Sequence, residues 1–239
     1  MSKPITVLQL YPKDMNIYGD HGNVLVIQRR LEWYGYEPTI IHYNVGDTLP
    51  TEVDIIIGGG GQDSGQDIIH ADLLKIGPQL KAFADAGVPM LMVCGLYQLF
   101  GNFFKTSQNK VLEGIGILDV ETHGSAERLI GNVVTTTEEF GDIIGYENHS
   151  GQTFLGKSVQ PFATVIKGAG NNAKDSHEGA RYKNVIGTYL HGSLLPKNPR
   201  LADFMIHTAV TKKYGDFSTD IIDDLLAGLA RDVAADRPR

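Results

Sequence analysis

Residues 89–101 read PMLMVCGLYQLFG and change from a strand pattern to a helix pattern at Cys94. The short apolar run before Cys94 is typical of a buried strand, and the residues after Gly95 are typical of a helix start. A nucleophile on such a sharp strand-to-helix turn has an accessible side chain, and the N–H groups that open the helix can stabilise an oxyanion. The alternative is a buried structural cysteine at a strand end, which is the commoner situation for a single cysteine.

Composition excludes several classes of protein. The chain has 239 residues, of which 42% are hydrophobic, so it can bury a sizeable core. Its single cysteine cannot form an internal disulfide, which favours a reducing compartment, the cytoplasm. The N-terminal apolar run is too short for a signal peptide, and no stretch is long enough to span a membrane. The net charge of −7 gives no electrostatic case for nucleic-acid binding. Histidines scattered around one thiol predict no metal site.

The first half of the chain alternates strands and helices. We predict a helix that Asn23 caps and that runs from Val24 to near Gly35, and a second helix over residues 68–86 that is interrupted at Gly77 and Pro78. Predicted strands flank these helices at residues 5–11, 39–43 and 53–57. This rhythm predicts an α/β fold with a mostly parallel central sheet flanked by helices.

The second half has a less regular pattern. Strands are predicted at residues 111–118, 128–137 and 184–190, a polar loop or strand end at 145–153, and a surface excursion at 168–180. Pro199 suits the first turn of a helix over residues 198–214. We expect one domain over residues 1–215. Residues 216–239 then form an amphipathic helix and tail, and this helix packs either on the domain or, less commonly, on a partner.

Four consecutive glycines, from Gly58 to Gly61, follow the third predicted strand. Ligands of open α/β sheets lie at the carboxyl ends of strands, and glycines allow close approach of the backbone. A phosphate-binding loop is one interpretation, but no GKS or GKT sequence follows. A flexible turn is another. An oxyanion loop facing Cys94 is favoured, because Cys94 is expected to end the adjacent strand.

His191 is the best candidate for a base that activates Cys94, since it ends the predicted strand at residues 184–190. A carboxylate at position 193 would share its face of the strand, but Ser193 stands there. The pair is therefore a dyad, or its third member comes from elsewhere, with Asp20 and Asp14 as candidates. The other histidines are weaker candidates: His42 and His207 fall in regular elements, His70, His123 and His177 in polar contexts, and His21 and His149 in loops that could approach the site.

Several motifs in fixed order carry a resemblance to a known family. They are CGLYQ, the glycine run, LEGIGILD, RLIGN, GYENHSGQT and KNVIGTYLHGSLLPKNP. Together they resemble the class I glutamine amidotransferases of the cobyric acid synthase-like group, and most of all the glutaminase subunits of lipid II isoglutaminyl synthases. The resemblance extends from the first strand to about Tyr214 and implies a flavodoxin-like, three-layer α/β fold.

The resemblance implies a two-subunit enzyme. This subunit would hydrolyse L-glutamine to glutamate and ammonia and would hold no cofactor or metal of its own. A Mur-ligase-like partner, MurT, would use ATP and Mg to activate the α-carboxylate of D-glutamate in the lipid II stem peptide, and would convert it to D-isoglutamine with that ammonia. By position, Cys94 matches the nucleophile and His191 the general base. Arg128 matches the arginine that binds glutamine, and a guanidinium can hold an α-carboxylate by two parallel hydrogen bonds.

The implied oxyanion donors are backbone N–H groups of Gly59, Gly60, Gly95 and Leu96, with Asp20 as a candidate third catalytic residue. The family usually has a second glycine where this chain has Leu96, so we expect that side chain to narrow the site or shift the helix. Three other functions compete: amidotransfer to another acceptor such as a cobalamin precursor, a non-catalytic regulatory or binding subunit of the same fold, and a cysteine peptidase of similar architecture.

Overall fold

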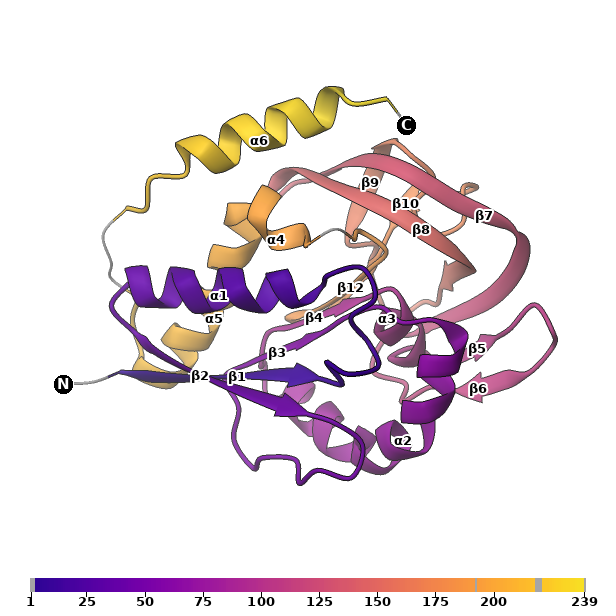
Figure 1. Cartoon of the computed structure of the whole chain (residues 1–239), viewed down its shortest axis with the longest axis horizontal. Helices are drawn as coiled ribbons and strands as arrows, with labels where there is room; N and C mark the ends of the chain where they lie inside the picture. The colour runs from indigo at the N-terminus through magenta and orange to yellow at the C-terminus, as the bar shows by residue number, and fades with distance from the viewer. Residues whose placement is uncertain (1–2, 192, 218–220, 239) are drawn as a thin grey trace.

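The computed structural model describes residues 3–191, 193–217 and 221–238. Its architecture is a central, mostly parallel sheet between helices, with a second, mostly antiparallel sheet beside it (Figure 1). The α/β prediction is therefore confirmed for the central sheet, whereas the second sheet was not predicted.

The central sheet has the strand order β11-β12-β4-β3-β1-β2, and all neighbours are parallel except β11 and β12. Strands β3, β4 and β12 are buried along their whole length, as expected for short apolar strands that helices cover on both faces. The bounds are Pro4–Leu10 (β1), Glu37–Tyr43 (β2), Ile55–Gly58 (β3), Met90–Val93 (β4), Ala180–Tyr182 (β11) and Val185–Thr188 (β12). The expected adjacency is confirmed, since β4 lies between β3 and β12.

Helices α1 and α5 pack on one face of this sheet, and α2 lies on the other (Figure 1). The helices are His21–Trp33 (α1), Asp63–Asp85 (α2), Gly95–Leu99 (α3), Leu194–Lys197 (α4), Pro199–Tyr214 (α5) and Leu225–Asp236 (α6). None of the helices among the described residues is long and apolar enough to cross a membrane.

Two predicted helix boundaries were wrong. Asn23 does not cap α1 but lies inside it, and its buried side chain accepts a hydrogen bond from the Leu195 N–H at 2.9 Å. Helix α2 continues through Pro78. The buried face of α2 explains this, because it runs without a break from Leu73 past Gly77 to Leu80, so packing outweighs the hydrogen bond that proline removes.

The second sheet is built around one long hairpin, β7 and β8, which pair antiparallel over most of their length. Its strands are Phe103–Lys105 (β5), Val111–Glu113 (β6), Val120–Thr137 (β7), Gly141–Leu155 (β8), Ala163–Lys167 (β9) and His177–Glu178 (β10). Residues 145–153 are thus strand rather than loop. Burial alternates along β8, so polar residues such as Glu147 and Thr153 occupy its inner face.

Residues 168–180 are not a surface excursion throughout, which corrects the prediction for this segment. Asn171, Asn172 and Glu178 are fully buried. The buried Glu147 carboxylate accepts hydrogen bonds from the Ala169 and Gly170 N–H groups. Internal hydrogen bonds therefore replace solvent as the partners of this polar sequence.

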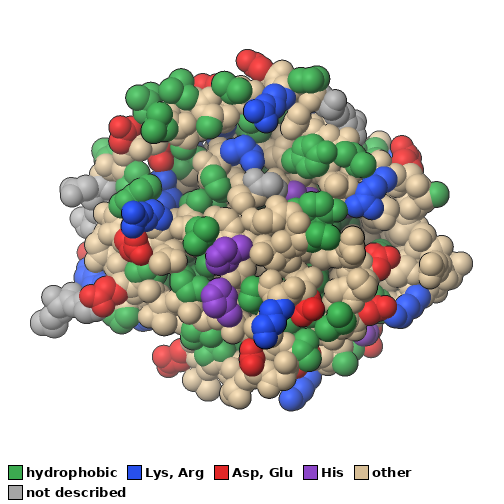
Figure 2. All heavy atoms as spheres, viewed as in Figure 1, with side chains coloured by type: hydrophobic (Ala, Val, Ile, Leu, Met, Phe, Trp, Pro, Cys, Tyr) green, Lys and Arg blue, Asp and Glu red, His purple; other side chains and the backbone are tan. Residues whose placement is uncertain are grey.

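The C-terminal helix begins at Leu225, later than the predicted residue 220, which lies outside the described residues. It contacts α4, β7 and β8, but it has no buried residue. Its apolar side chains point outward, with Leu226 79% exposed, and Figure 2 shows hydrophobic side chains gathered over this helix. Its polar groups make the contacts to the domain, for example Arg30 with Asp224 at 2.6 Å.

Candidate active site

Cys94 occupies the turn between β4 and α3, where the sequence predicts it. Its backbone has φ 51° and ψ −105°, a conformation that residues other than glycine seldom adopt. Such strain persists only where the surroundings enforce it. Here the Cys94 N–H donates to the Thr188 carbonyl of β12 at 2.8 Å, and the side chain is 6% exposed. The turn therefore holds the thiol at the carboxyl end of the parallel sheet.

His191 follows β12 and lies beside Cys94, as predicted. Its N–H donates to the Tyr146 carbonyl of β8 at 2.7 Å, and the residue is 1% exposed. Gly60 borders both side chains: a Cβ added there would lie 2.9 Å from His191 Cε1 and 3.0 Å from Cys94 Cβ. The sheet thus brings the predicted nucleophile and base together.

Asp20, one of the two candidate carboxylates, completes a buried cluster with this pair. Its Oδ1 lies 3.7 Å from His191 Nδ1, an ion-pair distance, and its Oδ2 accepts the Gly60 N–H at 2.7 Å. The carboxylate is 2% exposed. Asp14 instead contributes its backbone oxygen, which lies against Gly61 and Gly65. Position therefore selects Asp20 over Asp14.

The charges around His191 favour its protonated form. Burial lowers the pKa of His191, but the neighbouring Cys94 and the Asp20 carboxylate outweigh burial and raise that pKa to about 10. At neutral pH the imidazole is therefore cationic. A cation beside Cys94 stabilises the thiolate form, which is the nucleophile of cysteine chemistry.

The four glycines that end and follow β3 allow close packing of the loop that carries Asp20. A Cβ at Gly59 would lie 2.4 Å from the Met15 carbonyl oxygen, and one at Gly61 would lie 2.5 Å from Met15 Sδ. The Gly60 N–H is already bonded to Asp20, so it is not available to an oxyanion. This corrects the expectation for Gly60. Of the four glycines, Gly61 lines the cavity onto which Cys94 opens.

The Leu96 side chain does not enter the cavity. It is fully buried and fills the space above Gly58, where an added Cβ would lie 2.3 Å from Leu96 Cδ1. The elbow therefore accommodates a leucine because the facing strand residue is a glycine. The expected narrowing of the site by Leu96 was wrong.

A cavity of about 370 Å³ opens onto Cys94 between the two sheets. Arg128 of β7 lines it together with Cys94, although the two residues lie on different sheets. The Arg128 guanidinium donates from Nε to Asn148 Oδ1 at 2.7 Å and from Nη2 to the Tyr18 hydroxyl at 3.1 Å. The other residues that line the cavity are Gly61, Gln62, Asp63, Ser64, Gln66, Gln98, Phe104, His149, Ser150 and Gly151.

Three aromatic residues of this cavity, Tyr18, Phe104 and His149, were not predicted as site residues. His149 was predicted only as a loop histidine that could approach the site; it stacks on Tyr189 with ring centroids 3.6 Å apart. Burial lowers the pKa of His149 to about 3, so it is neutral. Tyr18 was missed, and its only signal was an aromatic residue in an otherwise polar loop close to Asp20. His21 bonds Gln9 and does not line the cavity.

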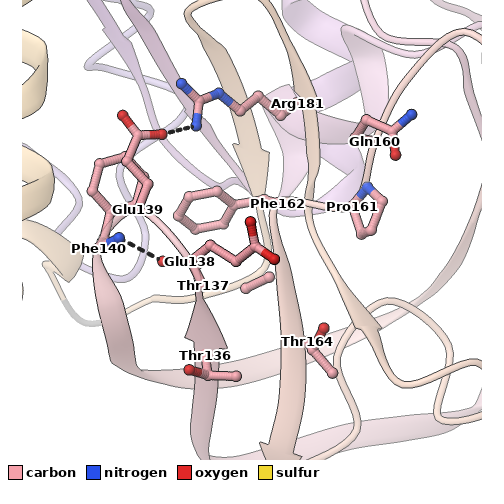
Figure 3. Close-up of a pocket in the computed structure, with 11 residues that line it drawn as sticks. Thr136, Thr137, Glu138, Glu139, Phe140, Gln160, Pro161, Phe162, Thr164 and Arg181 are labelled. Carbon is pink, nitrogen blue, oxygen red and sulfur yellow. Dashed lines mark hydrogen bonds and ion pairs between the residues drawn. The ribbon is translucent and has the colours of Figure 1, made fainter.

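A larger hollow, of about 600 Å³, lies at the turn between β7 and β8 (Figure 3). It contains Arg181 paired with Glu139, but no cysteine or histidine lines it. It therefore offers no nucleophile with a neighbouring base. Within residues 3–191, 193–217 and 221–238, no group of three or more His, Cys, Asp or Glu side chains is placed to hold a metal ion.

Comparison with protein families shows which known proteins this chain is similar to. The sequence pattern of the CobB/CobQ-like glutamine amidotransferase domain matches residues 6–199. A Staphylococcus aureus protein named lipid II isoglutaminyl synthase (glutamine-hydrolyzing) subunit GatD is 35% identical over 98% of this chain and 96% of its own length. The Streptococcus pneumoniae protein of the same name is 35% identical over 93% of this chain and 87% of its own length.

Solved structures show that the fold is shared more widely. A glutamine amidotransferase from Thermotoga maritima aligns with a TM-score of 0.56 and 14% identity, over 96% of this chain and 93% of that one. The glutaminase domain of Trypanosoma brucei CTPS aligns with a TM-score of 0.53 and 11% identity, over 92% of this chain and 98% of that one. At such identities the likeness concerns the fold alone.

Proposed function

The chain belongs to the CobB/CobQ-like glutamine amidotransferase family, and we propose that Cys94, His191 and Asp20 hydrolyse L-glutamine to supply ammonia to a second subunit. The observation that carries this proposal is the buried Cys94–His191–Asp20 cluster, which opens onto a cavity that also holds Arg128. The steps below need only side chains, backbone groups and water of this subunit.

The first step is formation of a thioester. The Cys94 thiolate attacks the side-chain amide carbon of glutamine, and the carbonyl oxygen becomes an oxyanion. The first N–H groups of a helix have no partner within that helix, so those of Gly95 and Leu96 are candidate oxyanion donors. Gly59 remains a weaker candidate. His191, cationic at neutral pH, donates its proton to the departing nitrogen, which leaves as ammonia.

The second step releases glutamate. Water replaces ammonia in the cavity, and His191, now neutral, takes a proton from it as it attacks the thioester carbon. The carbon–sulfur bond breaks, glutamate forms and the Cys94 sulfur regains its negative charge. Asp20 holds His191 in place and stabilises its positive charge through both steps.

Arg128 is proposed to bind the α-carboxylate of the substrate. Its guanidinium has five N–H donors, and the two protein partners account for two of them. The three remaining donors can hold a carboxylate. Asn148 fixes the orientation of the guanidinium, so it is preorganised for this role.

The names of the relatives suggest the destination of the ammonia. Both are subunits of a lipid II isoglutaminyl synthase. We therefore propose that this chain pairs with a Mur-ligase-like subunit, MurT, which uses ATP and Mg to activate the D-glutamate α-carboxylate of the lipid II stem peptide. The product would be D-isoglutamine, and because the reaction consumes ATP we place it in the cytoplasm.

Ammonia release from L-glutamine tests the proposal. Wild type and Cys94→Ala would be assayed alone and with the ligase-like subunit, ATP, Mg and lipid II. We expect the wild type to release ammonia, most rapidly in the complex, and the variant to release none. Amidated lipid II would establish the acceptor. Absence of ammonia from the wild-type complex would favour a non-catalytic subunit, whereas peptide cleavage would indicate a peptidase.

A further inference from the structure

Tyr18 spans the mouth of the cavity between the catalytic histidine and the arginine. Its ring lies over His191, with centroids 4.4 Å apart, and its hydroxyl accepts a hydrogen bond from Arg128 Nη2 at 3.1 Å. The residue is half-buried and lines the cavity. One side chain therefore contacts both the base that acts on the amide and the guanidinium proposed to bind the other end of the substrate.

The hydroxyl retains a donor of its own. It accepts from Arg128, and a tyrosine hydroxyl that accepts one hydrogen bond still carries a proton to donate. Beside it, Arg128 has three N–H groups beyond those directed at Asn148 and Tyr18. An anion held by Arg128 would therefore meet an O–H donor at its edge, and hydrogen bonds to a charged acceptor are the strong ones.

We propose that Tyr18 is a second recognition residue for the α-carboxylate of glutamine, donating its hydroxyl proton to the carboxylate that Arg128 binds. This inference rests on the proposed glutaminase function and extends it. It assigns the specificity for a free α-carboxylate to two neighbouring residues from different elements: Tyr18 from the loop before α1 and Arg128 from β7.

The loop does not need this hydroxyl for its own structure. The Ile17 N–H donates to the Gly60 carbonyl at 3.1 Å, and the Gly19 carbonyl accepts from Ser193 Oγ at 2.8 Å. Asp20 accepts the Gly60 N–H directly after them. With anchors on both sides of Tyr18, loss of its hydroxyl should leave the loop in place, so a change in substrate affinity would report on recognition.

The roles of ring and hydroxyl can be separated. In Tyr18→Phe the ring still covers His191, whereas in Tyr18→Ala it does not. We expect Tyr18→Phe to raise KM for L-glutamine about tenfold, because it removes a hydrogen bond to a charged group. Most of the fall in kcat/KM of this variant should come from the higher KM rather than from a lower kcat. Tyr18→Ala should lower kcat as well, since water then reaches His191.

Binding to the full-length Cys94→Ala protein gives a test that is independent of turnover. Dissociation constants would be measured by calorimetry for L-glutamine and for L-glutamine α-amide, in which a carboxamide replaces the carboxylate. Adding Tyr18→Phe should weaken L-glutamine binding about tenfold and change α-amide binding less than twofold. Tyr182→Phe is the matched control, since it removes a hydroxyl that bonds Asp85 on the surface.

The possible outcomes separate the two proposals. Equal losses for both ligands, or no loss for either, would overturn the role of Tyr18 and leave the glutaminase function intact. If the parent protein binds no L-glutamine at all, both the role of Tyr18 and the proposed function fail. A selective loss for L-glutamine that Tyr182→Phe does not reproduce supports Tyr18 as a carboxylate-recognition residue.

Discussion

At the scale of single residues, Asp20 is one of two residues that favour the protonated form of His191 in the proposed catalytic cluster. The side chains of His191 and Asp20 are almost fully buried, and the carboxylate opposes the effect of burial on the imidazole. Asp20→Asn keeps the shape and an oxygen that can accept the Gly60 N–H, but it removes the charge. The substitution therefore isolates the electrostatic contribution.

We predict that Asp20→Asn lowers kcat/KM for glutamine on the order of 100-fold. Without the carboxylate the pKa of His191 falls from about 10, so the imidazole loses its proton at lower pH. Because leaving ammonia needs that proton, the alkaline limb of the pH–rate profile should move to lower pH. Ammonia release measured from pH 6 to 11 would show the shift.

Asp14→Asn is the matched control for this experiment, because Asp14 approaches the glycine loop through its backbone. It should leave the pH profile unchanged. An unchanged alkaline limb in Asp20→Asn would show that the carboxylate does not control protonation of His191.

Leu96 allows a second prediction at this scale, on stability. Its side chain fills the space above Gly58, so Leu96→Ala should leave a cavity and cost about 3 kcal/mol of the free energy of unfolding. Urea unfolding would measure the cost. Retained glutamine affinity would agree with a packing role, whereas unchanged stability with tighter glutamine binding would show that Leu96 does narrow the site.

The site residues differ in how far local sequence identifies them. Cys94 and His191 each follow a short apolar strand, and the carboxyl ends of neighbouring parallel strands meet, so the sequence predicts that the two residues lie close together. Arg128 was identified only by family resemblance. Asp20 and Asp14 lie in one polar loop, and only the path of that loop over Gly59 and Gly61 decides between them. Tyr18 stood out only as an aromatic residue in a polar loop, because its partners, His191 and Arg128, come from distant elements.

At the scale of elements, the parallel sheet was predictable and the second sheet was not. Strands β3, β4 and β12 are short apolar runs that read as buried strands from composition alone. In contrast, β7 and β8 carry glycines and polar residues, and their partners within the domain satisfy these groups. Such strands are stabilised by pairing across the hairpin, which local patterns do not reveal.

Glu178 of β10 gives a prediction about the junction between the sheets. It is fully buried and accepts hydrogen bonds from the Thr188 hydroxyl and the Tyr189 N–H, close to His191. Burial raises the pKa of Glu178 to about 7, and the hydrogen bonds from Tyr189 and Thr188 do not offset this. The folded protein therefore keeps the proton in a pH range where the unfolded chain has lost it.

The sign of the pH effect follows from proton linkage. Between pH 4.5 and about 7 the folded state binds more protons at Glu178 than the unfolded state, so the free energy of unfolding falls as pH rises. Glu178→Gln should remove this contribution, which is on the order of 3 kcal/mol across the range. Urea unfolding of both proteins at pH 5 and pH 8 would measure the difference.

The difference between proteins is more informative than either curve, because buried His149 acts in the opposite direction. The pKa of His149 is lowered by burial to about 3, so it destabilises the fold as pH falls below 6.5. Glu138→Gln, in the exposed turn between β7 and β8, is the control for loss of one surface carboxyl group. A parallel offset of the Glu178→Gln and wild-type curves would contradict the assignment.

At the scale of the whole molecule, the cavity depends on both sheets. Cys94 and His191 lie at the carboxyl end of the central sheet, after β4 and β12, while Arg128 lies on β7 and Asn148 on β8. The His191 N–H bonds to the Tyr146 carbonyl, so the proposed base is itself tied to the second sheet. The proposed reaction and the proposed recognition of glutamine therefore use residues of both sheets.

The C-terminal helix α6 contributes no residue to this cavity. It has no buried residue and exposes its apolar side chains. Its links to the domain are polar. Asp224, just before the helix, pairs with Arg30, which also bonds Asp203 at 2.7 Å. Arg231 donates to the Asp142 carbonyl, and Lys167 donates to the Ala235 carbonyl. If the helix and Asp224 are deleted, the nearly buried Arg30 guanidinium therefore keeps Asp203 as an ion-pair partner.

We therefore predict that deleting residues 221–239 lowers the free energy of unfolding by only about 1 kcal/mol, or roughly 2–4 °C in Tm, and leaves glutamine affinity within twofold. Thermal unfolding and calorimetry of the deleted and complete proteins would measure both. Asp224→Asn is the control that removes the ion pair while keeping the helix and its other hydrogen bonds, and it should reproduce part of the loss. A collapse of the fold, or a large change in glutamine affinity, would instead show that α6 contributes to the domain through contacts beyond this pair.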